Sequence, residues 1–273
     1  MRPRDVRDWL RLRRLAENAA EIVSFRQSQR PGDLLWIRLR EGKGLELRGG
    51  TQDHSIFRSV WIDDEYRLDD AAPDAWECVV DLGANVGCFA ARALGLARRV
   101  IGYEPEPSNF GRLKHNLGGE PRAELHREAV GAKTGTIRLH PPLDGRGSGR
   151  FTAHPRPGLH DEEESIEVAC VSLDDLYRRH AIERCDLLKL DVEGAEYEIL
   201  RAAGDETLAR TRSIRGEYHD VPGSAAESLV AILEPRGFRV ELVPGGRTGS
   251  GLFFAERGPD QSPTSRSSKL GPR

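Results

Sequence analysis

Short apolar runs alternate with helical patterns along the middle of the chain. Cys78 to Leu82 is an apolar run with one acid near its end, as expected for a strand that is buried on both faces. A helical pattern follows as far as Ala97, and a second apolar run, Val100 to Tyr103, ends before Glu104. This order predicts one strand–helix–strand unit of a parallel sheet.

The same alternation continues to residue 257 and predicts one α/β domain with a mostly parallel sheet. The last two strands flank a glycine-rich turn, which predicts a terminal antiparallel hairpin. The predicted helices are Pro107–Leu117 and Ser224–Pro235, and the predicted strands are Ala123–Val130, Thr136–His140, Ser165–Val171, Asp186–Leu190, Arg212–Tyr218, Phe238–Val243 and Leu252–Glu256.

The first 70 residues have a different pattern, which predicts a cap in front of the sheet. Pro3 to Arg30 combines apolar residues with many arginines and predicts an amphipathic helix. Such a helix can bind an acidic membrane or a partner, but it more often packs on its own domain. Leu34–Arg40 and Leu45–Arg48 alternate like a hairpin, and Gln52–Asp63 reads as a helix. We expect this cap to cover one side of the cofactor or substrate cleft.

Composition limits the function classes. The chain has 273 residues, a formal net charge of −3 and 31% charged residues, so no strong field favours nucleic acid or membrane as a partner. Four cysteines without a C-x-x-C pair indicate buried thiols of a cytoplasmic protein. We expect residues 1–70 to form the cap, 71–257 the main domain and 258–273 a disordered tail rich in Pro and Ser.

The segment after the first buried strand has the composition of a cofactor-binding loop. Gly83, Asn85 and Gly87 stand where the strand gives way to the helix, and glycines let a ligand approach the backbone near free helical N–H groups. Glu104 is placed to accept hydrogen bonds from ribose hydroxyls. We therefore predict a nucleoside-cofactor site. The alternative, a glycine turn without a ligand, leaves the position of Glu104 unexplained.

The spacing within this loop favours one cofactor. Dinucleotide sites carry G-x-G-x-x-G, whereas this loop reads G-x-N-x-G, with Asp81 two residues before the first glycine. An acid in this position repels a pyrophosphate but attracts the ammonium of an amino-acid moiety. The loop resembles the first motif of S-adenosylmethionine-dependent methyltransferases, so S-adenosylmethionine is favoured over NAD.

Other polar residues follow predicted strands and are further site candidates. Asn109 lies close to Glu104 and is a candidate ribose partner, or only a helix cap. Glu128 lies near the expected position of adenine, where a solvated acid is equally reasonable. Asp191 and Glu193 follow a core strand and should face the cofactor crevice, because ligands bind at the carboxyl ends of parallel strands. They are candidates for a base, for cofactor binding or for holding a divalent cation.

The stretch Pro141 to Glu164 is rich in glycine, proline and acids and is too long for a simple turn. We expect it to be either mobile or a lid over the substrate.

Three segments together resemble the FkbM family of methyltransferases: VVDLGANVGCF, VIGYEPEPSNFGRLKHNL and LLKLDVEGAEYEIL. The resemblance covers roughly Gly49 to Arg257. It implies a class I methyltransferase fold with a seven-stranded, mostly parallel sheet. It also implies S-adenosylmethionine as cofactor and methyl transfer mostly to oxygen, on sugars, polyketides and related natural products. It assigns neither the acceptor nor the catalytic base.

Transfer to a hydroxyl requires a positioned nucleophile and removal of its proton. His219, at a strand end, is the titratable base that we favour, with Asp191 and Glu193 nearby, and we expect chemistry without a metal. Three alternatives stay open: an amine or carboxylate acceptor, a scaffold that binds the cofactor without catalysis, and a nucleic-acid methyltransferase. The last is disfavoured because the sequence has no basic patch with interleaved aromatic residues outside the N-terminal helix.

Overall fold

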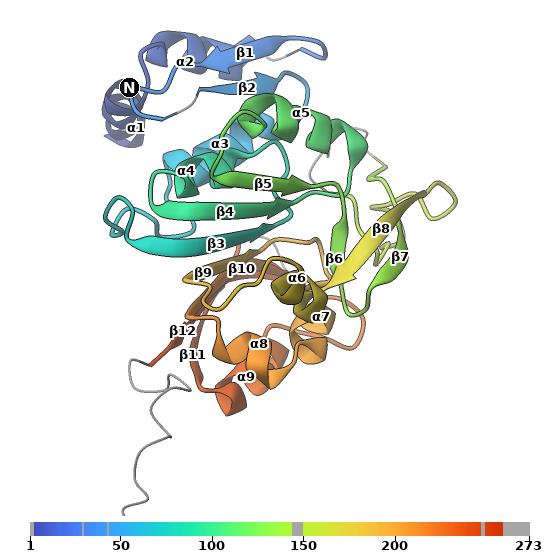
Figure 1. The fold of residues 1–273 in the computed structure, drawn as a ribbon. Helices are drawn as coiled ribbons and strands as arrows, with labels where there is room; N and C mark the ends of the chain where they lie inside the picture. The colour runs from blue at the N-terminus through green and yellow to red at the C-terminus, as the bar shows by residue number, and fades with distance from the viewer. Residues whose placement is uncertain (1–2, 29, 43, 144–149, 247–248, 259–273) are drawn as a thin grey trace, which may run out of the picture.

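A seven-stranded sheet forms the centre of the structure, a computed structural model that describes residues 3–28, 30–42, 44–143, 150–246 and 249–258 (Figure 1). The strand order is β11-β12-β10-β9-β3-β4-β5, and β12 runs antiparallel to both of its neighbours. This order confirms the predicted class I methyltransferase fold. The strands are β3 Trp76–Leu82, β4 Ala97–Tyr103, β5 Ala123–His126, β9 Leu187–Leu190, β10 Ser213–His219, β11 Phe238–Pro244 and β12 Ser250–Arg257.

Successive residues of the central strands face opposite layers, so the sheet is covered on both sides (Figure 1). Val79 and Val100 pack into the layer that contains the N-terminal elements, whereas Val80 and Ile101 pack into the other layer. The helices of the first layer are α3 Asp53–Trp61, α4 Cys88–Ala93 and α5 Pro107–Leu117; those of the second are α6 Leu173–Arg179, α7 Glu196–Ala202, α8 Asp205–Ala209, α9 Glu227–Leu233 and the 3₁₀ turn Glu234–Arg236.

Two of the predicted boundaries in this region were wrong. The helix after the glycine loop ends at Ala93, because Leu94 to Leu96 form a turn and Ala97 already belongs to β4. The predicted strand Ala123–Val130 is two strands, β5 and β6 Ala129–Gly131, which lie in different sheets.

The second sheet has the order β6-β8-β7 and lies beside the main one (Figure 1). Its other strands are β7 Gly135–Leu139 and β8 Ile166–Ser172, which pair antiparallel as predicted.

The N-terminal cap consists of two helices and a hairpin rather than one long helix. The predicted helix Pro3–Arg30 is interrupted between α1 Pro3–Leu15 and α2 Ala19–Ser28. Asn18 stands in the break, where its side chain accepts from the Arg38 amide at 2.9 Å and donates to the Trp36 carbonyl at 2.8 Å. The break therefore holds the two helices against the predicted hairpin, whose strands are β1 Leu34–Ile37 and β2 Leu45–Arg48.

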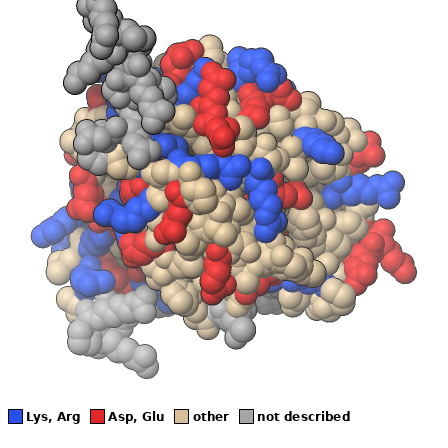
Figure 2. Space-filling view, turned by 90° about the horizontal axis from the view of Figure 1, so that it is seen from below, with Lys and Arg blue, Asp and Glu red and all other residues tan. Residues whose placement is uncertain are grey.

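This cap shares its core with the sheet. Ile22, Leu47 and Phe57 belong to the same buried cluster as Val79 and Val100. All four cysteines are buried free thiols, as predicted. Within the described residues, no helix is both long and apolar enough to cross a bilayer. On the face in Figure 2, Lys and Arg side chains are interspersed with Asp and Glu, consistent with the small net charge.

A buried ion pair joins two neighbouring central strands beneath the glycine loop. Asp81 on β3 and Lys189 on β9 are paired in register, and Lys189 Nζ lies 3.1 Å from Asp81 Oδ1. The contact has the distance of an ion pair but not the alignment of a good hydrogen bond. The better-aligned contact of Nζ is to the Gly83 carbonyl, at 2.8 Å. Burial raises the pKa of Asp81 in spite of this cation. Lys189 therefore positions the loop as well as neutralising the acid.

We expect Lys189→Met to lower the free energy of unfolding by about 3–5 kcal/mol, because it leaves Asp81 buried without a counter-charge. Urea titration checks this. In the double variant Asp81→Asn/Lys189→Met no charge is left behind, so it should be more stable than Lys189→Met alone. A double variant as unstable as the sum of both single variants would contradict the pairing.

Candidate functional site

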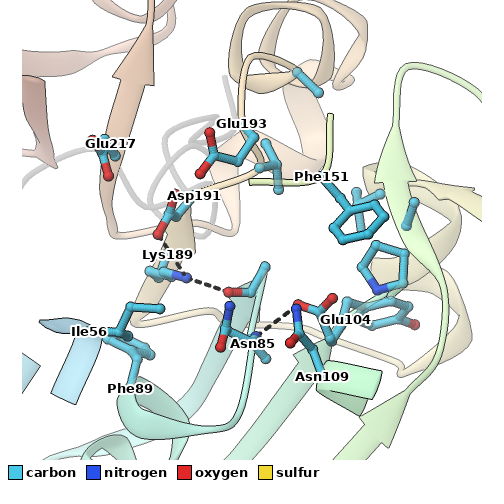
Figure 3. A pocket seen from close by; sticks show the side chains of 18 of the residues that line it. Ile56, Asn85, Phe89, Glu104, Asn109, Phe151, Lys189, Asp191, Glu193 and Glu217 are labelled. Carbon is cyan, nitrogen blue, oxygen red and sulfur yellow. Dashed lines mark hydrogen bonds and ion pairs between the residues drawn. The ribbon is translucent and has the colours of Figure 1, made fainter. Parts of the chain in front are cut away.

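A cavity of about 160 Å³ opens at the carboxyl ends of β3, β4, β9 and β10 (Figure 3). Figure 3 shows Glu104 and Asn109 on one side of it, and Asp191, Glu193 and Glu217 on the other. The N-terminal cap and the second sheet complete its wall. The main lining residues are Gln52, Ile56, Glu65, Tyr66, Gly83, Asn85, Phe89, Tyr103, Glu104, Asn109, Glu128, Val130, Ile137, Phe151, Lys189, Asp191, Glu193 and Glu217.

The glycine loop forms the floor of the cavity. Gly83 has φ +77°, and a Cβ there would lie 1.8 Å from the Asp191 carbonyl oxygen, so only glycine fits. Asn85 has φ +50°, and its amide donates to Glu104 Oε2 at 2.8 Å. Gly83, Asn85 and Glu104 therefore lie together in the wall, as the sequence pattern predicted.

Glu104 is a buried carboxylate at the wall of the cavity. The Glu106 amide donates to its Oε1 at 2.9 Å, so each carboxylate oxygen accepts one backbone N–H and keeps a second lone pair. Burial raises its pKa to about 7, although both amides oppose the shift. A carboxylate held in this way can receive two vicinal hydroxyls.

Asn109 and Glu128 also line the cavity, and each has a protein partner. Asn109 Oδ1 accepts from Arg48 Nη2 at 2.7 Å, and Glu106 rather than Asn109 caps helix α5. Glu128 pairs with Arg179 at 2.8 Å. Both residues are thus oriented by arginines at the rim.

The other two candidates from this region lie outside the cavity wall. Gly87 has φ +94° and starts helix α4; a Cβ there would lie 2.9 Å from Leu113 Cδ1, so the glycine is required by helix packing. Asp81 is fully buried and faces Lys189. The direct contact that we expected between Asp81 and a cofactor ammonium is therefore not supported by this geometry.

Carboxylates line the opposite side. Asp191 accepts from Tyr66 Oη at 3.2 Å and lies 3.7 Å from Lys189 Nζ. Burial raises the pKa of Glu193, and burial together with the charge of Asp191 raises that of Glu217. Burial likewise raises the pKa of Glu65. The pKa values of Glu193 and Glu217 are raised to about 7 and about 8, so these two acids can exchange protons near neutral pH.

His219 does not have the environment of a free base. Its Nε2 lies 3.4 Å from Glu193 Oε2 and 3.6 Å from Glu217 Oε1, while Nδ1 lies 3.2 Å from Glu196 Oε1. Burial lowers its pKa, but the hydrogen bond with Glu196 and the surrounding carboxylates outweigh burial and raise the pKa to about 10. His219 is therefore a buried cation behind two cavity acids; its role as the base stays a prediction, which this environment does not favour.

Glu196 lies in the first turn of α7 and is fully buried. Its Oε1 accepts from the amides of Val192 and Gly194, at 3.3 Å and 3.1 Å, so it fixes the turn that presents Glu193.

Several polar residues of the site were not predicted from the sequence, among them Lys189, Glu217, Tyr66 and Glu65. Of these, only Lys189 could have been recognised from the sequence, because a lysine inside the apolar run LLKL is exceptional in a buried strand. Glu217 lies on β10, and Glu65 and Tyr66 follow α3, so only the fold brings them together.

Part of the stretch Pro141–Glu164 lines the site. Thr152 bridges to His140 and donates from Oγ1 to the Glu193 carbonyl at 2.6 Å, and Phe151 lines the cavity. Residues 144–149 of this predicted lid lie outside the described residues.

Comparison with known proteins gives a family match over most of the domain. Residues 81–240 match the family model described as "Methyltransferase FkbM domain". A 2-O-methyltransferase NoeI of Sinorhizobium fredii is 32% identical over 155 residues, which cover 52% of this chain and 63% of that protein. The 31-O-demethyl-FK506 methyltransferase FkbM of Streptomyces tacrolimicus is 27% identical, over 75% of this chain and 88% of that protein.

Two further proteins are similar. A hexuronic acid methyltransferase AglP of Haloferax volcanii is 26% identical, over 72% of this chain and 73% of that protein. A crystal structure of a methyltransferase FkbM from Methylobacillus flagellatus superposes with a TM-score of 0.46 at 14% identity, over 91% of this chain and 58% of that one.

We predict that His219 stays protonated through neutral pH and titrates near pH 10 in the folded protein. An unfolded histidine titrates near ~6.5. The raised pKa therefore stabilises the fold fully below about pH 6.5, and this contribution is lost as the pH rises through 10. Histidine NMR titration and urea unfolding across this range check it.

His219→Gln should remove the alkaline loss of stability. The control is His54→Gln: burial lowers the pKa of His54 to about 4, so that variant should leave the alkaline slope unchanged. A titration of His219 below neutral pH would contradict the assignment.

Proposed function

The chain belongs to the methyltransferase FkbM domain family, and from this premise we propose that it transfers a methyl group from S-adenosylmethionine to a hydroxyl of a small-molecule acceptor. The observation that carries the proposal is the pairing of Glu104 with the Gly83–Asn85 turn in the wall of one cavity. The class of acceptor that we propose is a sugar, polyketide or related natural product.

The residues present fit this cofactor. Glu104 offers two free lone pairs to the ribose hydroxyls, with Asn109 beside it. The turn at Gly83 lets the methionine part approach the backbone. Tyr103, Val130 and Ile137 supply apolar surface for a base near Glu128. We therefore assign Gly83, Asn85, Glu104, Asn109 and Glu128 to the cofactor.

The acids on the opposite side face the acceptor. When bound, S-adenosylmethionine supplies an electrophilic methyl group. The chain must then align a hydroxyl and take up its proton, and a base is most effective when its pKa lies near the working pH. Glu217 meets this condition and is more open to the cavity than Glu193, with side-chain exposures of 36% and 14%.

We assign proton removal to Glu217, and the positioning of both acids to the buried cation of His219. Asp191, held by Tyr66 and Lys189, orients the acceptor.

The same acids favour a hydroxyl over a carboxylate as acceptor. Glu65, Asp191, Glu193 and Glu217 line the cavity, and an acidic acceptor would meet like charges in a poorly solvated place. The similarity to a hexuronic acid methyltransferase leaves a carboxyl acceptor as the second candidate. Mass spectrometry of products from paired glycosides, with and without a uronic acid, separates the two.

The cofactor assignment predicts that S-adenosylhomocysteine and S-adenosylmethionine bind and that NAD does not, as measured by calorimetry. Glu104→Ala should weaken S-adenosylhomocysteine binding by about 1–3 kcal/mol, because hydrogen bonds to a charged group are lost. Glu77→Ala is the control: that exposed acid pairs with Arg98 at the surface, so affinity should not change. Unchanged affinity in Glu104→Ala would remove Glu104 from the site.

The catalytic assignment predicts that Glu217→Gln lowers kcat roughly 10²–10⁴-fold and leaves S-adenosylhomocysteine affinity intact. Activity of the unaltered enzyme should rise from acidic to mildly alkaline pH, since burial raises the pKa of the acid that must lose its proton. The control is Glu241→Gln, an exposed acid paired with Arg67. A fully active Glu217→Gln enzyme would show that another group takes the proton. Cofactor binding without turnover on any glycoside or polyketide would favour a scaffold.

A further inference from the structure

Three potential metal ligands converge beside the edge strand of the main sheet, outside the cavity. Glu124 and His126 are two residues apart on β5, so their side chains share one face of the strand. His180 directly follows α6 and packs against the same face, with its ring centroid 4.8 Å from that of His126. In Figure 1, β5 forms one edge of the sheet.

The ligand atoms are close enough to share one ion. One atom from each of the three residues lies within 4.8 Å of the others. Glu124 Oε2 and His180 Nδ1 are 3.1 Å apart. His126 Nε2 is buried and has no hydrogen-bond partner among the described residues. Buried polar atoms are normally paired, so this nitrogen requires a partner that the described part of the chain does not provide.

The remaining polar atoms of the cluster are already held in place. Arg99 Nε donates to Glu124 Oε1 at 2.5 Å, which leaves Oε2 facing His180. Tyr103 Oη lies 2.9 Å from His180 Nε2. Metal-binding histidines and carboxylates usually have such a second partner, which fixes their orientation. The cluster therefore has both the ligands and the supporting contacts of a metal site.

We propose that Glu124, His126 and His180 bind a divalent cation of the zinc class. Two imidazoles and one carboxylate are a common ligand set for Zn²⁺, whereas Mg²⁺ and Ca²⁺ prefer oxygen ligands alone. The Glu124 side chain is 41% exposed, so a water can complete a tetrahedron. A purely protein network accounts for the contacts of Glu124 and His180 but leaves His126 Nε2 without a function.

The positive charge of Arg99 is the main factor that opposes binding of a cation at this site. Its Nη2 lies 3.4 Å from His180 Nδ1, so a bound cation would be close to a guanidinium. The exposure of the Glu124 side chain to solvent screens part of this repulsion. We expect selective binding weakened by Arg99, and Arg99→Gln should therefore tighten or preserve it rather than abolish it.

The site is structural rather than catalytic. Tyr103 separates it from the cavity: its ring stacks on His126 at 4.8 Å, its hydroxyl contacts His180, and it also lines the cavity. Binding at Nδ1 of His180 leaves Nε2–H to donate to Tyr103 Oη, so the ion would hold this tyrosine in the cofactor wall. This inference does not rest on the proposed methyl transfer.

Calorimetry with ZnCl₂ on the untagged full chain tests the proposal, and CoCl₂ provides a spectroscopic readout. We expect one ion per chain, with the visible absorption of tetrahedral Co²⁺. Glu124→Gln and His126→Gln preserve side-chain size, and each should weaken binding by at least about 100-fold, the upper range for loss of a supporting contact. Circular dichroism verifies that these variants are folded.

His115→Gln is the matched control, because this histidine is exposed and interacts with Glu46 elsewhere on the surface. It should bind zinc as the unaltered chain does. Zinc binding that survives in both Glu124→Gln and His126→Gln, or no binding by the unaltered chain, would overturn the proposal. Binding of S-adenosylhomocysteine, measured on the same preparations, reports separately on the methyltransferase site.

Discussion

The buried ammonium of Lys189 is the interaction on which the site depends. It lies in the middle of β9 among apolar neighbours, and its contacts are to the loop carbonyl of Gly83 and the carboxylates of Asp81 and Asp191. The neighbouring acids keep it charged: burial alone lowers its pKa, but Asp81 and Asp191 raise it above the usual value. One side chain therefore fixes the turn of the glycine loop, the end of β9 and the first acid of the acceptor side.

The acids of the cavity depend on a second buried cation in the same way. His219 faces Glu193, Glu196 and Glu217 from behind. Without a nearby positive charge, three carboxylates in this space would bind protons and lose their directional contacts. With it, Glu196 can fix the backbone turn through two amides while Glu193 and Glu217 reach the cavity. His219 thus holds the acids in place from behind the wall of the cavity.

The parts of this site that depend on local sequence could be predicted. The sequence pattern is a strand, a glycine turn and an acid after the next strand. It predicted that Gly83, Asn85 and Glu104 lie together, because both strands end at the same edge of the sheet. It could not derive contacts between distant segments. Asp81 faces Lys189 because β3 and β9 are paired in register over 108 residues of separation, a pairing absent from any local pattern.

The errors in the secondary structure have the same origin. Pro3–Arg30 has a continuous helical pattern, but Asn18 makes its hydrogen bonds to β1 and its neighbours, and this tertiary contact breaks the helix. Likewise, Ala123–Val130 has the sequence pattern of a single strand, but its two parts pair in two different sheets.

Different parts of the cavity wall have different structural origins. The cofactor side is built from the ends of β3 and β4, whose positions the sheet fixes. Other parts of the cavity wall come from α3 and from the segment around Phe151, which belong to the cap and to the long connection after β7. Replacing residues there changes the shape of the cavity without disturbing the strand ends. We therefore expect acceptor preference to respond first to substitution of Ile56 and Phe151, and cofactor binding to respond first to changes at the ends of β3 and β4.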